Sequence, residues 1–202
     1  MESKGRTQEQ RSTATRQALV AAARRLWAER GYAEVGTPEI AAAAGVTRGA
    51  MYHQFADKAA LFLAVMEAVE QDVVSRLAAR VAASGPATPA AALRAAVEPW
   101  LAICVDPEVR QLLLLDAPSV LGWEKCRDVT QRYSLGMTER LLVEAMDAGQ
   151  LAVQPARALA HILIGALDEA AMVIATAEDR DQARADVGEV LRRLFDGLLT
   201  DS

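Results

Sequence analysis

The fold is decided by residues 37–55, which read TPEIAAAAGVTRGAMYHQF. Thr37 can cap a short helix that Gly45 ends, because threonine accepts from free backbone N–H groups and glycine adopts the left-handed conformation that closes helices. Thr47 can cap a second short helix that runs through Gln54. Two short helices joined by a glycine-containing turn predict a helix-turn-helix.

The side chains of this stretch separate into two faces. Those expected to point inward are small or apolar: Ala41, Val46, Met51 and Phe55. Those left outside are Arg48, Gly49, Tyr52 and His53. Residues four apart share one helix face, arginine can read guanine edges, and tyrosine and histidine can reach phosphates or bases. The outer face therefore predicts contact with duplex DNA, and the alternative is a short-helix corner with a purely structural role.

The rest of the chain predicts more helices and no sheet. Its 202 residues are 52% hydrophobic but only 4% aromatic, a composition that favours helices over strands. Asp57 and Asp181 can each cap a helix. Besides the short pair, apolar periodicity predicts helices over about 12–30, 58–83, 90–105, 107–117, 120–148, 155–176 and 181–199, and residues 118–122 are expected to be irregular. The fold class is all-α, with about nine helices.

Charge is distributed unevenly along the chain. The net charge is -5, yet residues 1–58 hold nine basic against six acidic side chains, which makes that part +3 and leaves −8 for the remainder. A basic end on an acidic chain is a hint of nucleic-acid binding. The tail also carries Lys4, Arg6, Arg11 and Arg16, which are either a DNA-tracking arm or a disordered soluble tail.

Targeting and redox signals point to the cytoplasm. The first residues lack the apolar segment of a signal peptide. Residues 158–177 are apolar but contain Asp168 and Glu169, and an acid at a bilayer centre costs about 3 kcal/mol, so we expect a protein-buried helix and no membrane partner. Cys104 and Cys126 do not form a metal-type pair, so we expect free thiols and no metal.

The sequence gives little support to a catalytic function. It contains no GxGxxG, GxxxxGK[ST] or HExxH pattern. A cysteine paired with His161 as a nucleophile is a spatial possibility that we do not favour. We expect neither catalysis nor a cofactor.

Four blocks of residues occur in an order that resembles a known family. They read AARRLWAERGY at 22–32, TPEIA at 37–41, GVTRGAMYHQF at 45–55 and DKAALF at 57–62. Together they resemble the N-terminal domain of the TetR (tetracycline-repressor-like) family of bacterial transcription regulators, over about residues 15–65. The all-helical remainder and the total length also suit that family.

The resemblance implies a function and a set of DNA contacts. It implies a ligand-responsive regulator, most often a repressor, that binds a palindromic operator as a homodimer and is released by a small-molecule effector. The alternative is an all-α small-molecule-binding or catalytic protein. The matching DNA-contact positions are Thr37, Thr47, Arg48, Gly49, Tyr52, His53 and Lys58. The chain departs from the family pattern at Gln54, where members often have histidine, and at Ala59 and Ala60, where many have an acid.

A composition break divides the chain into parts. Residues 84–89 read SGPATP, the clearest linker in the sequence. We therefore expect a DNA-binding domain over 1–56 with a basic arm over 1–14, a connecting helix over 57–83, and an effector-binding and dimerisation domain over 84–202.

The last two predicted helices carry wide apolar faces. Such faces suit a four-helix dimer interface made by two helices from each subunit, and the alternative is a monomer core. Gly165 and Gly188 would permit close approach. The candidate interface residues are Leu159, Ile162, Ala166, Val173, Val187, Val190, Leu191 and Leu194.

An effector pocket is expected among the middle helices. Its candidates combine an apolar body with a polar group, or supply a charged anchor, although each could equally be a core residue. They are Trp100, Cys104, Asp116, Trp123, Tyr133, His161 and Asp168. Few charges fall within 112–121, which favours a small apolar or aromatic effector.

Overall fold

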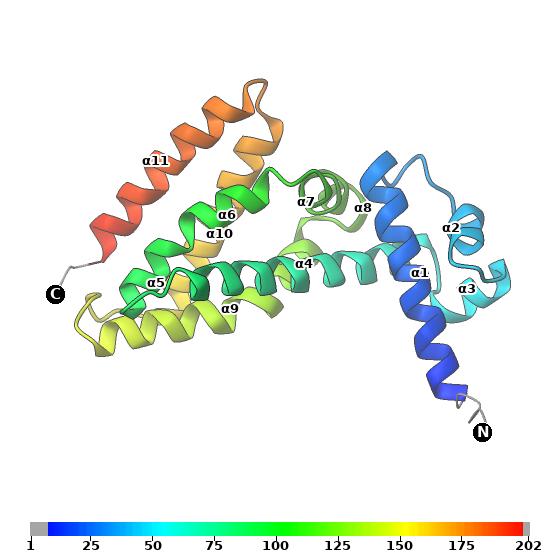
Figure 1. The fold of residues 1–202 in the computed structure, drawn as a ribbon, viewed down its shortest axis with the longest axis horizontal. Coiled ribbons are helices and arrows are strands. Elements are labelled where there is room, and N and C mark those ends of the chain that lie inside the picture. The colour runs from blue at the N-terminus through cyan, green and yellow to red at the C-terminus, as the bar shows by residue number, and fades with distance from the viewer. Residues whose placement is uncertain (1–7, 200–202) are drawn as a thin grey trace.

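The computed structural model describes residues 8–199, and helices account for most of them (Figure 1). The N-terminal helices are α1 (Gln8–Arg30), α2 (Thr37–Ala43), α3 (Arg48–Gln54) and α4 (Lys58–Ala83). The others are α5 (Pro89–Ala95), α6 (Val97–Cys104), α7 (Pro107–Val109), the π-helix η1 (Arg110–Asp116), α8 (Ala117–Leu121), α9 (Trp123–Asp147), α10 (Ala156–Thr176) and α11 (Arg180–Leu198). Since α5 runs into α6, and α7 into η1 and α8, these helices form nine units. The all-α prediction is confirmed.

Helix caps were predicted correctly at two of four positions. Thr47 accepts a hydrogen bond from Ala50 N at 3.1 Å, and Asp57 accepts one from Ala60 N at 2.7 Å. Thr37 was wrong as a cap, because the cap of α2 is Gly36 and Thr37 is already helical. For α11 the cap is Asp179 rather than Asp181, because the helix begins two residues earlier than expected.

The start of α1 also differs from expectation. The helix begins at Gln8, so Arg11 and Arg16 project from a helix rather than from a loose arm. Lys4 and Arg6 lie outside the described residues.

The N-terminal helices share a core with the first half of α4. Trp27 of α1 is fully buried, and its ring lies 5.3 Å from that of Phe62 and 5.4 Å from that of Tyr32, between centroids. The turn between α2 and α3 is closed by Val46 N, which donates to Ala41 O at 2.9 Å. Gly45 in this turn has φ +68°, a conformation that favours glycine. Helices α1 to α3 therefore form a compact head on one end of α4.

A second core joins the remaining helices at the other end of α4. Leu142 of α9, Ala160 of α10 and Leu101 of α6 are almost fully buried in it, and α11 adds Phe195. Figure 1 shows α4 extending from the head to α5 and α9, with α10 and α11 far from α2 and α3. Helix α10 is the one described helix long and apolar enough to cross a membrane. It packs against α9 and α11, as a core helix does.

The middle of the chain breaks at the end of the stretch that was expected to be irregular. The sequence predicted a helix over 120–148 with an irregular start at residues 118–122. Instead α8 ends at Leu121, and Gly122, with φ +81°, separates it from α9. Residues 107–121 thus form one helical segment that lies beside α1 and α4 (Figure 1).

Candidate DNA-binding and effector sites

The exposed face of α3 carries the side chains predicted to read DNA. Arg48, Gly49, Tyr52 and His53 are all exposed. The Tyr52 hydroxyl lies 3.3 Å from the Thr37 hydroxyl, and the Arg48 guanidinium lies 5.6 Å from the centre of the Tyr52 ring. The hydrogen bond with Thr37, and then the one with Arg48, lower the pKa of Tyr52. Thr37 therefore orients Tyr52, and α2 and α3 present one connected surface.

Lys58, at the start of α4, contacts the protein itself. Its ammonium donates to the Tyr32 carbonyl at 2.6 Å and lies 4.0 Å from the centre of the Tyr32 ring. Burial lowers its pKa, and the charge of Asp116 opposes that effect. One of the three ammonium hydrogens is thus committed to holding the end of α1 against the start of α4.

The unusual Gln54 joins α3 to α1. Its side-chain amide donates to Ser12 Oγ at 2.9 Å, and Arg16 donates to the Gln54 carbonyl at 3.4 Å. The Arg16 guanidinium also lies 4.3 Å from the centre of the Phe55 ring. These contacts place Gln54 and Arg16 in the packing of the head.

Ion pairs connect the head to the segment 107–121. Arg24 of α1 donates to both oxygens of Glu108, at 2.7 and 2.6 Å, and to Asp72 of α4 at 3.2 Å. Glu108, followed by Asp72, raises the pKa of Arg24. A second link joins Tyr32 N to the Asp116 carboxylate at 2.9 Å. Asp116 was wrong as a pocket residue, because its carboxylate faces the head.

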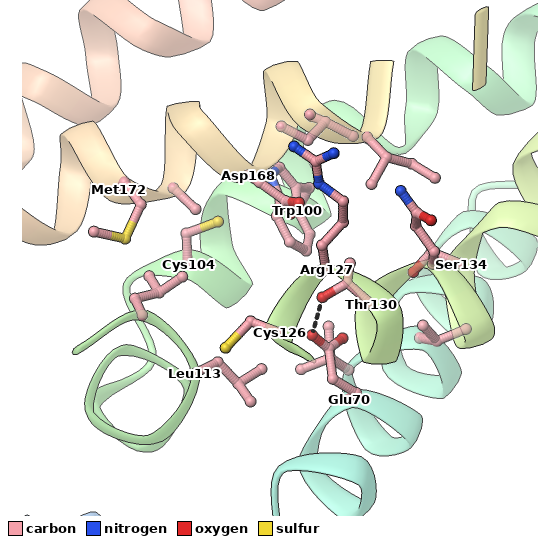
Figure 2. A pocket seen from close by; sticks show the side chains of 18 of the residues that line it. Glu70, Trp100, Cys104, Leu113, Cys126, Arg127, Thr130, Ser134, Asp168 and Met172 are labelled. Atoms are coloured by element: carbon pink, nitrogen blue, oxygen red, sulfur yellow. Dashed lines mark hydrogen bonds between the residues drawn. The ribbon is translucent and has the colours of Figure 1, made fainter. Parts of the chain in front are cut away.

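A cavity of about 310 Å³ lies between α4, α6, η1, α9 and α10 (Figure 2). Five predicted pocket residues line it: Trp100, Cys104, Trp123, His161 and Asp168. Tyr133 does not. It lines a separate hollow with residues of α1 and α4, such as Val20 and Ala64.

Two carboxyl groups distinguish this cavity from an ordinary core. Glu70 of α4 is only 7% exposed, and its carboxylate accepts a hydrogen bond from Thr130 at 2.7 Å. Burial raises the pKa of Glu70, and the Thr130 bond opposes the rise. Asp168 of α10 has its pKa raised to about 7, first by burial and then by the charge of Glu70, while Arg127 acts in the opposite direction.

The two thiols are buried at the cavity wall. Burial raises the pKa of Cys104 to about 12 and raises that of Cys126 as well. Both are free, as predicted. Thiols held in the protonated form are poor nucleophiles, so they contribute size and polarisability here.

Sequence reasoning missed most of the cavity's polar residues. The missed ones are Glu70, Arg127, Thr130, Gln131, Ser134 and Thr138. A signal for Glu70 exists in the sequence, because it interrupts the apolar face of α4 between Met66 and Val73 at helical spacing. The residues of α9 give no such signal, since polar side chains occur all along that helix.

The predicted interface residues fall into three groups. Ile162, Val173, Val190 and Leu194 are exposed apolar side chains. Leu159, Ala166 and Val187 are half-buried. Leu191 was wrong, because it is 4% exposed and belongs to the core of its own subunit. Gly188 also faces inward, since a Cβ there would lie 3.0 Å from Leu101.

Both the N-terminal and the C-terminal part of the chain match models of known protein families. Residues 19–65 match the model of bacterial regulatory proteins of the tetR family, and residues 90–198 match that of the tetracyclin repressor-like C-terminal domain. The HTH-type transcriptional regulator AcrR of Shigella flexneri is 37% identical over 143 residues, which cover 70% of this chain and 64% of AcrR. The transposon Tn10 TetC protein of Escherichia coli is 27% identical over 82% of both chains.

A solved structure agrees over nearly the whole length. It is a TetR-family transcriptional regulator from Pectobacterium atrosepticum, 32% identical, with a TM-score of 0.84 over 97% of this chain and 99% of that one. Regulators of this family bind DNA operators as dimers with small-molecule effectors, and they are generally cytoplasmic. The alternative of a catalytic or purely ligand-binding protein is not favoured. This chain therefore belongs to the TetR family and is a ligand-responsive, DNA-binding transcription regulator rather than an enzyme.

Proposed function

We propose that this protein is a cytoplasmic repressor that binds a palindromic operator as a homodimer and leaves it when a small molecule with an apolar or aromatic body fills the cavity. One observation carries the proposal. The segment 107–121 lines the cavity through Val109, Leu113 and Pro118, and it bonds to the head, to Arg24 of α1 through Glu108 and to the backbone N–H of Tyr32 through Asp116. A ligand in the cavity would thus press on a segment that is bonded to the DNA-reading head.

The operator-reading role rests on the α2–α3 surface. Arg48 and His53 would reach base edges or phosphates, and the close approach would be permitted by Gly49. Thr37 and Thr47 set the geometry of this reading face, Thr37 through its hydrogen bond with Tyr52 and Thr47 by capping α3. Lys58 would use its remaining hydrogens on a backbone phosphate.

The effect of a bound ligand would pass from the cavity to the DNA-reading head by two routes. The first is α4, which lines the cavity through Met66, Glu70 and Val73 and begins in the head. The second is the segment 107–121, through the ion pair of Glu108 with Arg24 and the hydrogen bond of Asp116 with Tyr32 N. A π-helix is a rare, less regular geometry that often occurs at functional sites, so η1 is suited to two packings. A coupling of about 1–3 kcal/mol between the two sites would be enough to change operator occupancy.

The parts of the chain would divide this work. Residues 1–56 would form the DNA-binding domain, 57–83 the connecting helix, and 84–202 the effector and dimerisation domain. The exposed apolar side chains of α10 and α11 would pack against the same helices of a second copy. Two heads would then read half-sites about one turn of DNA apart.

In vitro selection from random duplexes tests the operator-binding role directly. We expect a palindromic consensus and an affinity that falls steeply with salt. Arg48→Ala should cost roughly 1–3 kcal/mol and relax the preference at one base pair of each half-site. Arg140→Ala, at an exposed position of α9, is the matched control. Failure to enrich any sequence would refute the operator-binding role.

A further inference from the structure

We propose that the effector is an amphipathic organic cation, with an aromatic or apolar body and an ammonium or similar group that lies between Glu70 and Asp168. The inference rests on the proposed function, since it names the chemical class that the same cavity takes. It narrows the expectation of an apolar or aromatic effector by adding a positive charge.

The two carboxyl groups come from opposite walls. Figure 2 shows Glu70 rising from α4 and Asp168 pointing in from α10, on the two sides of the cavity that they both line. Among the described residues, Thr130 alone donates a hydrogen bond to Glu70. No described residue donates a hydrogen bond to Asp168 or forms an ion pair with it.

The protein supplies little positive charge to balance them. Of the residues that line the described cavity, Arg127 is the one Lys or Arg, and it is an exposed residue. It acts on Asp168 less strongly than burial and Glu70 do. The remaining basic group on the wall is the imidazole of His161. Glu70 is buried with one hydrogen-bond donor, and Asp168 is half-buried with none among the described residues. Carboxylates that are shielded from water and poorly paired are costly, so a ligand cation placed between the acids would recover free energy that no side chain recovers.

The rest of the wall suits the body of such a molecule. Trp100 and Trp123 line the cavity, and indole rings attract cations and stack on aromatic groups. Met66, Met137 and Met172 add flexible sulfur atoms that contact aromatic rings favourably. The buried Trp100 indole N–H has no acceptor, so a hydroxyl or ether oxygen on the ligand would also be satisfied.

Other ligand classes fit this wall less well. An organic anion would bring a third negative charge beside Glu70 and Asp168. A neutral alcohol could donate one hydrogen bond but would leave the carboxylate charge unbalanced. The wall therefore ranks ligands of one skeleton in the order cation, neutral molecule, anion.

Three ligands on one naphthyl skeleton test this order. They are 2-(2-naphthyl)ethylamine, 2-(2-naphthyl)ethanol and 2-naphthylacetic acid, each titrated calorimetrically into the full-length protein without DNA at pH 8. We expect the amine to bind at least tenfold more tightly than the alcohol, and the acid to bind most weakly. Equal or tighter binding of the alcohol or the acid, or no binding of the amine, overturns the proposal.

Charge-removing variants locate the interaction. Asp168→Asn and Glu70→Gln keep the side-chain size, and each should weaken the amine at least tenfold while changing the alcohol less than threefold. Asp128→Asn removes an exposed acid of α9 that does not line the cavity, and should change neither. Equal losses for the amine and the alcohol in both cavity variants would indicate a structural role and refute the charge contact.

A DNA-release assay separates this inference from the proposed function. If the amine binds as expected but leaves the selected operator duplex bound, the ligand class stands and the effector role of the cavity fails. If the alcohol or the acid releases the operator better than the amine does, the effector role stands and the ligand class fails.

Discussion

Asp168 shows how burial changes the meaning of one acidic residue. In the sequence it counts as an argument against a membrane span and as a candidate anchor. In the structure its pKa is raised from 3.8 to about 7, chiefly by burial. Near neutral pH it is therefore poised between its two charge states, so a bound cation would shift it towards the carboxylate.

The Asp168→Asn variant should change the pH dependence of stability. The folded protein keeps this proton at pH values where the unfolded chain has lost it, because the folded pKa is the higher one. The stabilising effect is complete below about pH 4 and is lost as the pH rises through 7. The variant should thus gain roughly 2–4 kcal/mol of unfolding free energy over wild type at pH 8 and almost none at pH 4.

Urea unfolding at several pH values measures this difference, at one fixed protein concentration because dimerisation adds to stability. Asp128→Asn serves as the exposed-acid control. A gain of equal size at pH 4 and pH 8 would assign the effect to packing instead of titration.

Lys58 combines a structural contact with a predicted phosphate contact. Lys58→Ala removes the donor to the Tyr32 carbonyl, which should lower the unfolding free energy by about 1 kcal/mol. It should also weaken binding to all DNA sequences alike and reduce the salt slope of the affinity by about one. Chemical denaturation and DNA titrations at four salt concentrations give the two numbers. An unchanged salt slope would leave Lys58 with the structural role alone.

At the scale of elements, what the sequence could predict depends on how local the signal is. The caps Thr47 and Asp57 were found because capping depends on residues three positions away. An irregular stretch was expected at 118–122, but the π-helix η1 and the exact position of the break at Gly122 were missed, because both depend on how 107–121 packs between α1, α4 and α10. Glu108 and Asp116 became important through partners more than 80 positions away, which periodicity cannot reveal.

The bond between α7 and α1 should carry part of the response to the effector. Glu108→Gln keeps the side-chain size and leaves Arg24 paired with Asp72. It removes the negative charge that the segment 107–121 contributes to this ion pair. We expect the operator affinity without ligand to change less than threefold. The loss of affinity caused by a saturating ligand should shrink at least about fivefold, which is within the usual range of coupling.

Fluorescence anisotropy with labelled operator measures both quantities, using whichever naphthyl compound releases the wild-type protein. Glu139→Gln is the control, because Glu139 pairs with Arg157 on α10, far along the chain from the head. An unchanged ligand effect in Glu108→Gln would leave α4 as the route of transmission.

The whole molecule explains how an acidic protein can bind DNA. The head lies at one end of α4, and most of the acidic residues belong to the other end (Figure 1). The net charge of -5 is therefore compatible with a basic surface that meets phosphates. The uneven distribution of charge could be predicted from the sequence alone. The position of the cavity between five helices could not, because it depends on the tertiary fold.

The proposed dimer is the last whole-molecule property that can be tested by a single substitution. Val190 is 65% exposed on α11 and does not line the cavity, unlike Ile162, so it tests the interface alone. In a two-fold dimer each substitution occurs twice, so Val190→Glu would bury two charges in an apolar contact.

We expect Val190→Glu to elute as a monomer of 21.6 kDa in light-scattering chromatography, where the wild type has twice that mass. Its circular dichroism should be unchanged. Operator affinity should fall at least tenfold, because a single head reads only one half-site. Val153→Glu is the matched control, since Val153 is 89% exposed in the loop between α9 and α10. If Val190→Glu remains dimeric, the subunits associate through another surface and the α10–α11 face needs a different explanation.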